Sequence, residues 1–384
     1  MSLKVASRGR VPPFIVMDVL REANAREAAG QSVLHLEVGQ PGTPAPPAAL
    51  AAARLALEKS RLGYTDALGL PALRQALARH YGSFYGVEVP AERIAVTTGS
   101  SGAFLLAFLA SFEAGDRVAL AAPGYPAYKN ILRALDVEPV LLPAEAADRF
   151  QPTPALLDAV EGRLDGLIVA SPSNPTGTML DEAHLLALSR YCRDRGIRLI
   201  SDEIYHGITY GFPTTTLAAH DEQAIVVNSF SKYFSMTGWR IGWLVLPPDL
   251  VRPVECLAQN LAISVPTLSQ EAALGALDSR AVLDGYVADY AAKRALLLAE
   301  LPKAGLDRLA PADGAFYLYA DVGHLTNDSE ALCKRLLAET GVALAPGTDF
   351  DQARGSRTLR VSFAGPYDHM AEAARRLAAF FRRG

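Results

Sequence analysis

Residues 224–246 read "AIVVNSFSKYFSMTGWRIGWLVL" and place a polar segment between two apolar runs. Each run has the length and the β-branched or aromatic content of a buried strand, and Lys232 follows the first run directly. Ser229 and Ser231 stand beside this lysine, and Arg240 comes just before the second run. A strand that ends in a lysine, hydroxyl groups and an arginine indicates a binding site at the end of a sheet.

Short apolar runs of the same kind recur from about residue 90 onward, with helical patterns between them. The predicted strands cover residues 93–98, 117–122, 166–171, 197–202, 224–230 and 241–246. One intervening helical pattern begins after Asp181, a good N-cap residue, and ends at Gly196, a good C-terminal glycine. Continuously apolar strands that alternate with helices predict an α/β fold whose mainly parallel sheet is covered by helices on both faces.

The chain is 384 residues long, which suggests two domains. The pattern of predicted helices and strands changes after about residue 275. The later segments are a long helix at 286–301, an apolar segment at 314–322, a helix at 329–341, a short strand at 342–346 and a strand-like run at 357–364. The Pro- and Gly-rich residues 38–50 are typical of a connector. We therefore predict an N-terminal arm (1–45) that packs with the small domain, a large domain (46–275) and a smaller α+β domain (276–384).

Composition excludes several functional classes. The formal net charge is −4, which does not suit a nucleic-acid-binding surface, and the 7 histidines show no metal-ligand spacing, so we expect no metal. The 3 cysteines form no close pair, which favours a reducing compartment. No run approaches the ~20 apolar residues of a membrane span, and prolines interrupt the N-terminal apolar run, so we expect no membrane association and a cytoplasmic location.

Polar residues follow four of the predicted strands. Residues 99–102 read "GSSG", Asn174 follows a second strand, Asp202 and Tyr205 follow a third, and the Lys232 segment follows the fourth. Each could serve only local structure, because Ser, Asn and Asp commonly cap helices and form turns. In an open α/β sheet, however, ligands bind beyond the carboxyl ends of the strands. Four such groups at one edge therefore predict a site.

The chemistry of these groups points to one cofactor. A "GSSG" sequence at a helix N-terminus offers free N–H groups and hydroxyls to a phosphate, and Arg240 adds a bidentate cation. A desolvated lysine near an arginine has a lowered pKa, which makes its amine available to an aldehyde. A carboxylate at a strand end can hold a heteroaromatic nitrogen protonated. Together these requirements describe pyridoxal 5'-phosphate.

The segment "SFSKYFSMTGWRIG" (229–242) resembles the lysine signature of the class I and II aminotransferases, the fold-type I enzymes related to aspartate aminotransferase. The resemblance covers most of the chain. It implies that Lys232 is the Schiff-base lysine and proton carrier, that Asp202 pairs with the pyridine nitrogen, and that Tyr205 and Asn174 donate to the phenolic oxygen of the ring. It places the phosphate among Ser100, Ser101, Ser229, Ser231 and Arg240.

The same resemblance extends to residues outside the strand ends. Tyr125 in "PGYPAY" matches the aromatic residue that stacks on the cofactor ring, and Tyr64 matches a tyrosine that reaches the phosphate of the neighbouring subunit. That match implies a homodimer with shared active sites. Arg360 in "LRVSFA" matches the arginine that binds the substrate α-carboxylate, and Gly39 matches the glycine whose backbone lies against it.

The function implied is transfer of an amino group between an L-amino acid and a 2-oxo acid, with ping-pong kinetics. The arm sequence "VPPFIVMD" and the uncharged Ser101 lack the groups with which the bacterial aspartate enzymes bind a second carboxylate. A neutral or apolar amino acid is therefore the favoured donor. The alternatives are a β-lyase of the C–S lyase type on the same fold, and an aspartate- or glutamate-specific aminotransferase with an unrecognised carboxylate ligand. No GxGxxG follows a strand, so a nicotinamide oxidoreductase is rejected.

Overall fold

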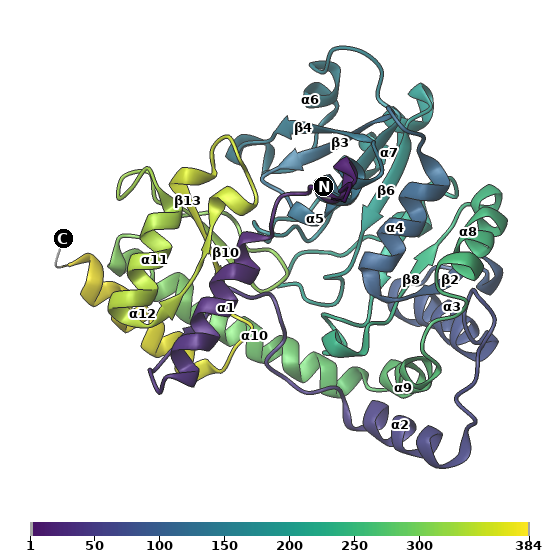
Figure 1. The fold of residues 1–384 in the computed structure, drawn as a ribbon, viewed down its shortest axis with the longest axis horizontal. Helices are drawn as coiled ribbons and strands as arrows, with labels where there is room; N and C mark the ends of the chain where they lie inside the picture. Colours follow the sequence, from purple (N-terminus) through teal and green to yellow (C-terminus); the bar gives the residue numbers. More distant parts are fainter. Residues whose placement is uncertain (1–2, 383–384) are drawn as a thin grey trace.

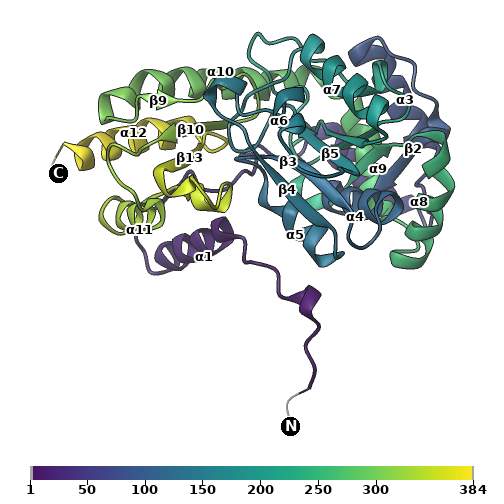
Figure 2. The ribbon, with the colours of Figure 1, turned by 90° about the horizontal axis from the view of Figure 1, so that it is seen from above.

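The structure, a computed structural model, describes residues 3–382. Figure 1 shows a larger sheet packed between helices and a smaller sheet with its own helices, and the long helix α10 (Arg280–Glu300) runs from one part to the other. Figure 2 shows the same division from above. In residues 3–382 no helix combines the length and the apolar character that crossing a bilayer requires.

The larger sheet has seven strands in the order β2-β8-β7-β6-β5-β3-β4. Their bounds are β2 Ile94–Thr97, β3 Arg117–Ala122, β4 Glu138–Pro143, β5 Gly166–Ala170, β6 Arg198–Asp202, β7 Ile225–Ser229 and β8 Gly242–Val245. Strands β4, β3, β5, β6 and β7 are parallel, whereas β8 is antiparallel to both β7 and β2. Every strand except β8 therefore ends at the same edge, and the polar residues that follow β2, β5, β6 and β7 gather there.

Helices cover both faces of this sheet, as its apolar strands predict. Leu167 and Val169 of β5 pack in one buried cluster, whereas Ile168 between them packs in the other. The helices of this part are α2 Pro47–Lys59, α3 Pro71–Tyr85, α4 Gly99–Ser111, α5 Pro126–Ala134, α6 Pro154–Asp158, α7 Glu182–Arg195, α8 Pro248–Leu261 and α9 Thr267–Leu277. The predicted α/β fold with a mainly parallel, helix-covered sheet is confirmed.

The smaller sheet has four antiparallel strands in the order β12-β13-β10-β9. Their bounds are β9 Arg308–Leu309, β10 Tyr317–Asp321, β12 Ala345–Pro346 and β13 Thr358–Ser362, and the helices beside them are α11 Ser329–Thr340 and α12 Tyr367–Phe381. Separately, β1 (Leu34–His35) pairs in parallel with β11 (Val342–Ala343). The central strands β10 and β13 are buried and face the carboxyl edge of the larger sheet.

The N-terminal helix α1 (Ile15–Ala28) packs against this smaller sheet. Val16 shares a buried cluster with Tyr319, Ala345 and Phe350. The helix begins at a carboxylate far along the chain, because Asp349 accepts hydrogen bonds from Ile15 N at 3.1 Å and Val16 N at 3.2 Å. Asp349 therefore fixes the start of α1. The domain limits at residues 45 and 275 stay a prediction.

The local structure agrees with the sequence-based predictions at several points and differs from them at others. Asp181 caps α7 by accepting from His184 N at 2.9 Å, and Gly196 ends it with φ +66°, both as predicted. The segment 38–50 is not wholly a connector, because α2 begins at Pro47. The segment 342–346 is not one strand, because β11 and β12 pair in different sheets.

Candidate active site

A cavity of about 280 Å³ lies at the carboxyl edge of the larger sheet, between it, the smaller sheet and α1. Most of the predicted site residues line its wall: Gly39, Ser100, Ser101, Tyr125, Asn174, Asp202, Tyr205, Ser231, Lys232, Arg240 and Arg360. Two do not. Ser229 lies behind the wall, and Tyr64 is 82% exposed and outside the cavity. The fold thus brings residues from both sheets to one place.

Lys232 stands three residues beyond the end of β7 and extends into this cavity. Its Nζ donates to Gly39 O at 2.5 Å. Burial, reinforced by the nearby cations Arg360 and Arg240 and partly offset by Asp202, lowers the pKa of the Lys232 amine to about 8. A larger fraction of this amine than of an ordinary lysine is therefore unprotonated near neutral pH, as a nucleophile or a general base requires.

Asp202, the last residue of β6, is a buried carboxylate aimed at the cavity. Its Oδ1 accepts from Ile204 N at 3.0 Å, and its Oδ2 accepts from the hydroxyl of Tyr128. Burial raises the pKa of Asp202 to about 6, against the lowering effect of these hydrogen bonds and of Lys232. A cationic N–H placed opposite this carboxylate would hold it ionised. Nothing in the sequence pattern pointed to Tyr128 beyond its place three residues after Tyr125.

Arg360 lies in the middle of β13 and is only 1% exposed. Its guanidinium is held between the rings of Tyr317 and Phe350, with Cζ 4.5 and 4.7 Å from the two ring centres. Nη1 donates to Asn174 Oδ1 at 2.9 Å and Nη2 donates to the carbonyl of Glu37. A buried cation with only neutral acceptors is costly and suits an incoming anion.

The remaining donor capacity of Arg360 supports the same conclusion. Its Nε is buried and has no hydrogen-bond partner, and no ion pair of the described residues involves Arg360. Such an orphaned donor in a cavity wall is uncommon unless a ligand completes it. A carboxylate matches the planar fork of a guanidinium. The sequence predicted the buried strand but not the two aromatic rings that sandwich this side chain.

The Arg240 guanidinium and the N-terminus of helix α4, which carries a partial positive charge, meet at the cavity wall. Helix α4 begins at Gly99 with φ +70°, and no side chain caps its N-terminal N–H groups. Arg240 lies so close to this helix start that a Cβ at Gly99 would come within 2.5 Å of Nη2. A helix N-terminus and a guanidinium repel each other unless an anion lies between them. Ser100, Ser101 and Ser231 border the same space, and Thr237, which the sequence analysis missed, joins them.

Ser229 has a different place from the one expected for a direct ligand. Its Oγ accepts from Ser231 N at 3.0 Å and lies 3.0 Å from Ile241 O, to which it donates. Ser229 is the last residue of β7 and is not part of the cavity wall, whereas Ser231, which lies beyond the end of the strand, lines the cavity. Ser229 therefore supports the loop that carries Ser231 and Lys232.

Aromatic and apolar groups complete the wall. Tyr205 forms a hydroxyl–hydroxyl hydrogen bond of 2.7 Å with Tyr317, and a Cβ at Gly39 would overlap the Tyr317 hydroxyl. Tyr125 packs edge-to-face on Phe14, with ring centres 5.8 Å apart. The roof comes from α1 and the residue before it, and consists of Phe14, Val16, Met17 and Leu20. Ile15, which lies between two of these residues in the sequence, is not part of the wall.

Comparison with known proteins gives a consistent result. The family described as aminotransferase class I and II matches residues 31–377. A valine–pyruvate aminotransferase of Mycobacterium tuberculosis is 51% identical over 384 residues, which is 99% of each protein. An aspartate/prephenate aminotransferase of Thermus thermophilus is 34% identical over 97% of each. The crystal structure of an aminotransferase from Mycobacterium tuberculosis covers 100% of both chains, with 50% identity and a TM-score of 0.98.

Proposed function

This chain belongs to the class I and II aminotransferases, and from that premise we propose that its amino donor is a neutral or apolar L-amino acid. As an aminotransferase it exchanges an amino group between an amino acid and a 2-oxo acid. The observation that carries the proposal is the part of the cavity wall that α1 supplies, which consists of the apolar residues Val16, Met17 and Leu20. The charged residues of the wall within the described chain are Asp202, Lys232, Arg240 and Arg360, and no further cation remains for a second carboxylate.

The relatives support this donor class. A valine–pyruvate aminotransferase shares 51% of its residues with this chain, whereas the aspartate/prephenate enzyme shares 34%. Valine has a branched apolar side chain, which is the kind of group that the α1 roof would bury. We propose valine or a similar aliphatic amino acid as donor and pyruvate or another small 2-oxo acid as acceptor. Neither the β-lyase nor an aspartate-specific enzyme is favoured.

The family depends on pyridoxal phosphate in general, and we propose that this chain binds it in the cavity. Its phosphate would bind between the positively polarised α4 N-terminus and the Arg240 guanidinium. Ser100, Ser101 and Ser231 would add hydrogen bonds to it. The raised pKa of Asp202 fits a carboxylate that awaits the ring N–H. Tyr125 would stack on the face of the ring, Tyr205 and Asn174 would donate hydrogen bonds to the phenolic oxygen, and Lys232 would bond to the aldehyde carbon.

The reaction then divides among the residues as follows. The bound cofactor supplies an aldehyde that captures the substrate amine and an electron-poor ring that accepts the electron pair released at Cα. Arg360 would bind the α-carboxylate and so orient the substrate with its Cα–H bond toward Lys232. Lys232 Nζ accepts the Cα proton and later returns it, as base and then acid. Because Arg360 would hold the carboxylate in this orientation, decarboxylation is disfavoured.

Both half-reactions use the same carboxylate site. The amino acid and the 2-oxo acid present the same α-carboxylate to Arg360, and the first product leaves before the second substrate enters, so kinetics should be ping-pong. We also propose a homodimer in which the exposed Tyr64 reaches the partner subunit's phosphate site. A cytoplasmic location stays a prediction.

An absorbance assay with a panel of amino acids tests the proposed function. We expect valine and other aliphatic amino acids to convert the visible band of the purified holoenzyme to the amine form, with release of a 2-oxo acid and no ammonia. Aspartate should react at least about tenfold more slowly, since its second carboxylate meets an apolar roof. A faster reaction with aspartate would contradict the donor class, and release of ammonia with pyruvate would indicate a β-lyase.

Asp349 provides a separate prediction about the roof. The Asp349→Asn variant should raise KM for valine by roughly tenfold, because the charged cap that fixes the start of α1 is weakened. KM for alanine should change much less, because its methyl group does not reach the roof. Steady-state kinetics with both donors measure the difference.

Asp351 supplies the matched control, since it lies in the same loop and is equally buried, at 4% exposure. Its carboxylate bonds to Ala353 N and Arg354 rather than to α1. The Asp351→Asn variant should lose comparable stability yet keep the valine-to-alanine ratio of the unmodified protein. If the two variants changed that ratio equally, the assignment of Asp349 to the roof would be wrong.

A further inference from the structure

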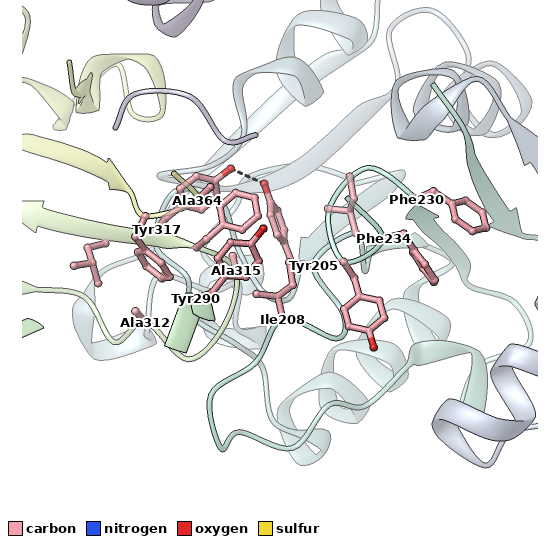
Figure 3. Packing of buried hydrophobic residues seen from close by; sticks show 14 of the residues in the cluster. Tyr205, Ile208, Phe230, Phe234, Tyr290, Ala312, Ala315, Tyr317 and Ala364 are labelled. Carbon is pink, nitrogen blue, oxygen red and sulfur yellow. Dashed lines mark hydrogen bonds between the residues drawn. The ribbon is translucent and has the colours of Figure 1, made fainter. Parts of the chain in front are cut away.

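Tyr317 is a buried residue of the cavity wall that the proposed reaction does not use. It belongs to β10 of the smaller sheet and is 1% exposed. Its hydroxyl lies 2.7 Å from that of Tyr205, which follows a strand of the larger sheet, and Figure 3 shows the two rings meeting from opposite sides. This contact joins residues that are 112 positions apart. It therefore depends on how the two sheets are assembled.

Tyr317 also contacts the proposed carboxylate site. The guanidinium of Arg360 lies over its ring, with Cζ 4.5 Å from the ring centre. Gly39, whose carbonyl accepts from Lys232, approaches the Tyr317 hydroxyl so closely that a side chain there would overlap it. One phenol thus touches the residues proposed for carboxylate binding and for tuning of the cofactor. No hydrogen bond of its hydroxyl, other than that to Tyr205, occurs within residues 3–382.

The direction of the hydrogen bond between the two hydroxyls decides what Tyr205 can do. Each tyrosine has one O–H proton and can also accept. If Tyr205 donated to Tyr317, the Tyr205 hydroxyl proton would be engaged in that hydrogen bond and could not be donated to a ligand in the cavity. If Tyr317 donates instead, Tyr205 accepts from it and keeps its own proton for the ligand. Only the second arrangement lets Tyr205 serve as a donor to a phenolic oxygen.

The electrostatics favour Tyr317 as the donor. Burial raises the pKa of both phenols and Arg360 counteracts that rise in both, but the pKa of Tyr205 is raised well above its ordinary value, whereas that of Tyr317 is raised less. Of two neutral hydroxyls in contact, the more acidic one is the better donor. A cation over an aromatic ring also stabilises the electron density that donation leaves on the phenol oxygen.

We propose that Tyr317 is a positioning residue that donates to Tyr205 and thereby directs the Tyr205 hydroxyl proton toward the phenolic oxygen of the bound cofactor. The proposal rests on the cofactor assignment above. It also links two sites, because Arg360 acts on Tyr317 and Tyr317 acts on Tyr205. Donation by Tyr205 makes the phenolic oxygen less electron-rich and so makes the nearby imine nitrogen on Lys232 less basic. Loss of the Tyr317 hydroxyl should therefore raise the basicity of that nitrogen.

A pH titration of the visible absorption of the holoenzyme tests this inference. The Tyr317→Phe variant should show a titration midpoint about 0.5 to 1 pH unit higher than that of the unmodified holoenzyme, since one neutral hydrogen bond is lost from the chain. If Tyr317 were instead the acceptor, its removal would free Tyr205 to donate more strongly, and the midpoint would fall. An unchanged or lowered midpoint would overturn the inference.

Tyr319 provides the matched control on the same strand. It is 4% exposed, and its hydroxyl bonds to Thr358 at 2.7 Å, outside the cavity. The Tyr319→Phe variant loses a partly buried hydroxyl–hydroxyl hydrogen bond and so some thermal stability. Its titration midpoint should stay unmoved, because this bond does not reach the cavity. An equal shift in both variants would assign the effect to general loosening of the smaller sheet and would overturn the inference.

A double variant makes the test independent of stability. In a Tyr205→Phe background the second substitution, Tyr317→Phe, should produce no further shift, because its effect passes through the Tyr205 hydroxyl. Additive shifts would contradict the proposed chain of hydrogen bonds. An unmodified protein with no pH-dependent visible band would overturn the cofactor assignment itself, whereas a normal band with an unmoved midpoint in Tyr317→Phe would overturn only the role of Tyr317.

Discussion

Replacement of Lys232 by alanine should abolish transamination, with a fall in kcat on the order of 10⁴ or more, because one side chain supplies both the nucleophilic amine and the proton carrier. The cofactor should still bind. The contacts proposed for its phosphate, at the α4 N-terminus and Arg240, and for its ring, at Asp202, do not involve the lysine. Single-turnover kinetics with valine and spectroscopic titration with pyridoxal phosphate separate the two effects.

Lys293 is the control for loss of a buried lysine. It is 3% exposed, pairs with Asp289 on α10 and lies outside the cavity wall. The Lys293→Ala variant should lose stability and retain the kcat of the unmodified enzyme. Appreciable turnover by the Lys232→Ala variant would refute the role of Lys232, and loss of cofactor affinity with intact chemistry would point to a binding role alone.

The sequence predicted the edge of the sheet at which the site lies, because that edge follows from local patterns. Apolar runs with helices between them imply a parallel sheet, and the carboxyl ends of parallel strands meet at one edge. Lys232 and Asp202 could therefore be placed together before any contact was known. The antiparallel β8 did not disturb this placement, since β2 beyond it again runs in the common direction.

Some elements escaped prediction for identifiable local reasons. Strand β4 contains Pro139 and Pro143, which normally argue against a strand, but β4 is at the edge of the sheet, where missing N–H groups are tolerated. The segment 342–346 looked like one strand, but its two halves pair with different sheets. A sequence pattern shows which residues prefer an extended conformation and does not show which partner each residue finds.

The supporting residues of the site could not be predicted, because their contacts span the whole chain. Tyr317 meets Tyr205 across 112 residues, Asp349 reaches the start of α1 across 334, and Tyr128 bonds to Asp202 across 74. Each is an ordinary residue in its own segment. The roles of Tyr317 and Asp349 arise only when the smaller sheet and α1 pack with the rest of the chain, and that of Tyr128 only when α5 brings it to the end of β6. Motif spacing identifies groups that perform chemistry, but the residues that orient them require the fold.

Substitution of Arg360 by leucine should lower kcat/KM by roughly a hundredfold to a thousandfold for the amino acid and the 2-oxo acid alike, since both lose the charge partner of the same carboxylate. This fall in kcat/KM should come mainly from a higher KM. The Arg360→Lys variant should recover little, because an ammonium cannot form the two parallel hydrogen bonds of a guanidinium. Arg357, exposed just before β13 and outside the cavity, supplies the control, and Arg357→Leu should leave both KM values unchanged.

Stability should respond in the opposite sense from activity. In the free protein Arg360 is a buried cation with neutral acceptors, an unpartnered Nε and aromatic rings on either side. Leucine in that apolar setting removes a desolvated charge, so the Tm of the apoprotein should stay the same or rise. Thermal melts of the apoprotein with and without a 2-oxo acid measure this. Stabilisation by the 2-oxo acid should disappear in Arg360→Leu, and if it persisted, the carboxylate would bind elsewhere.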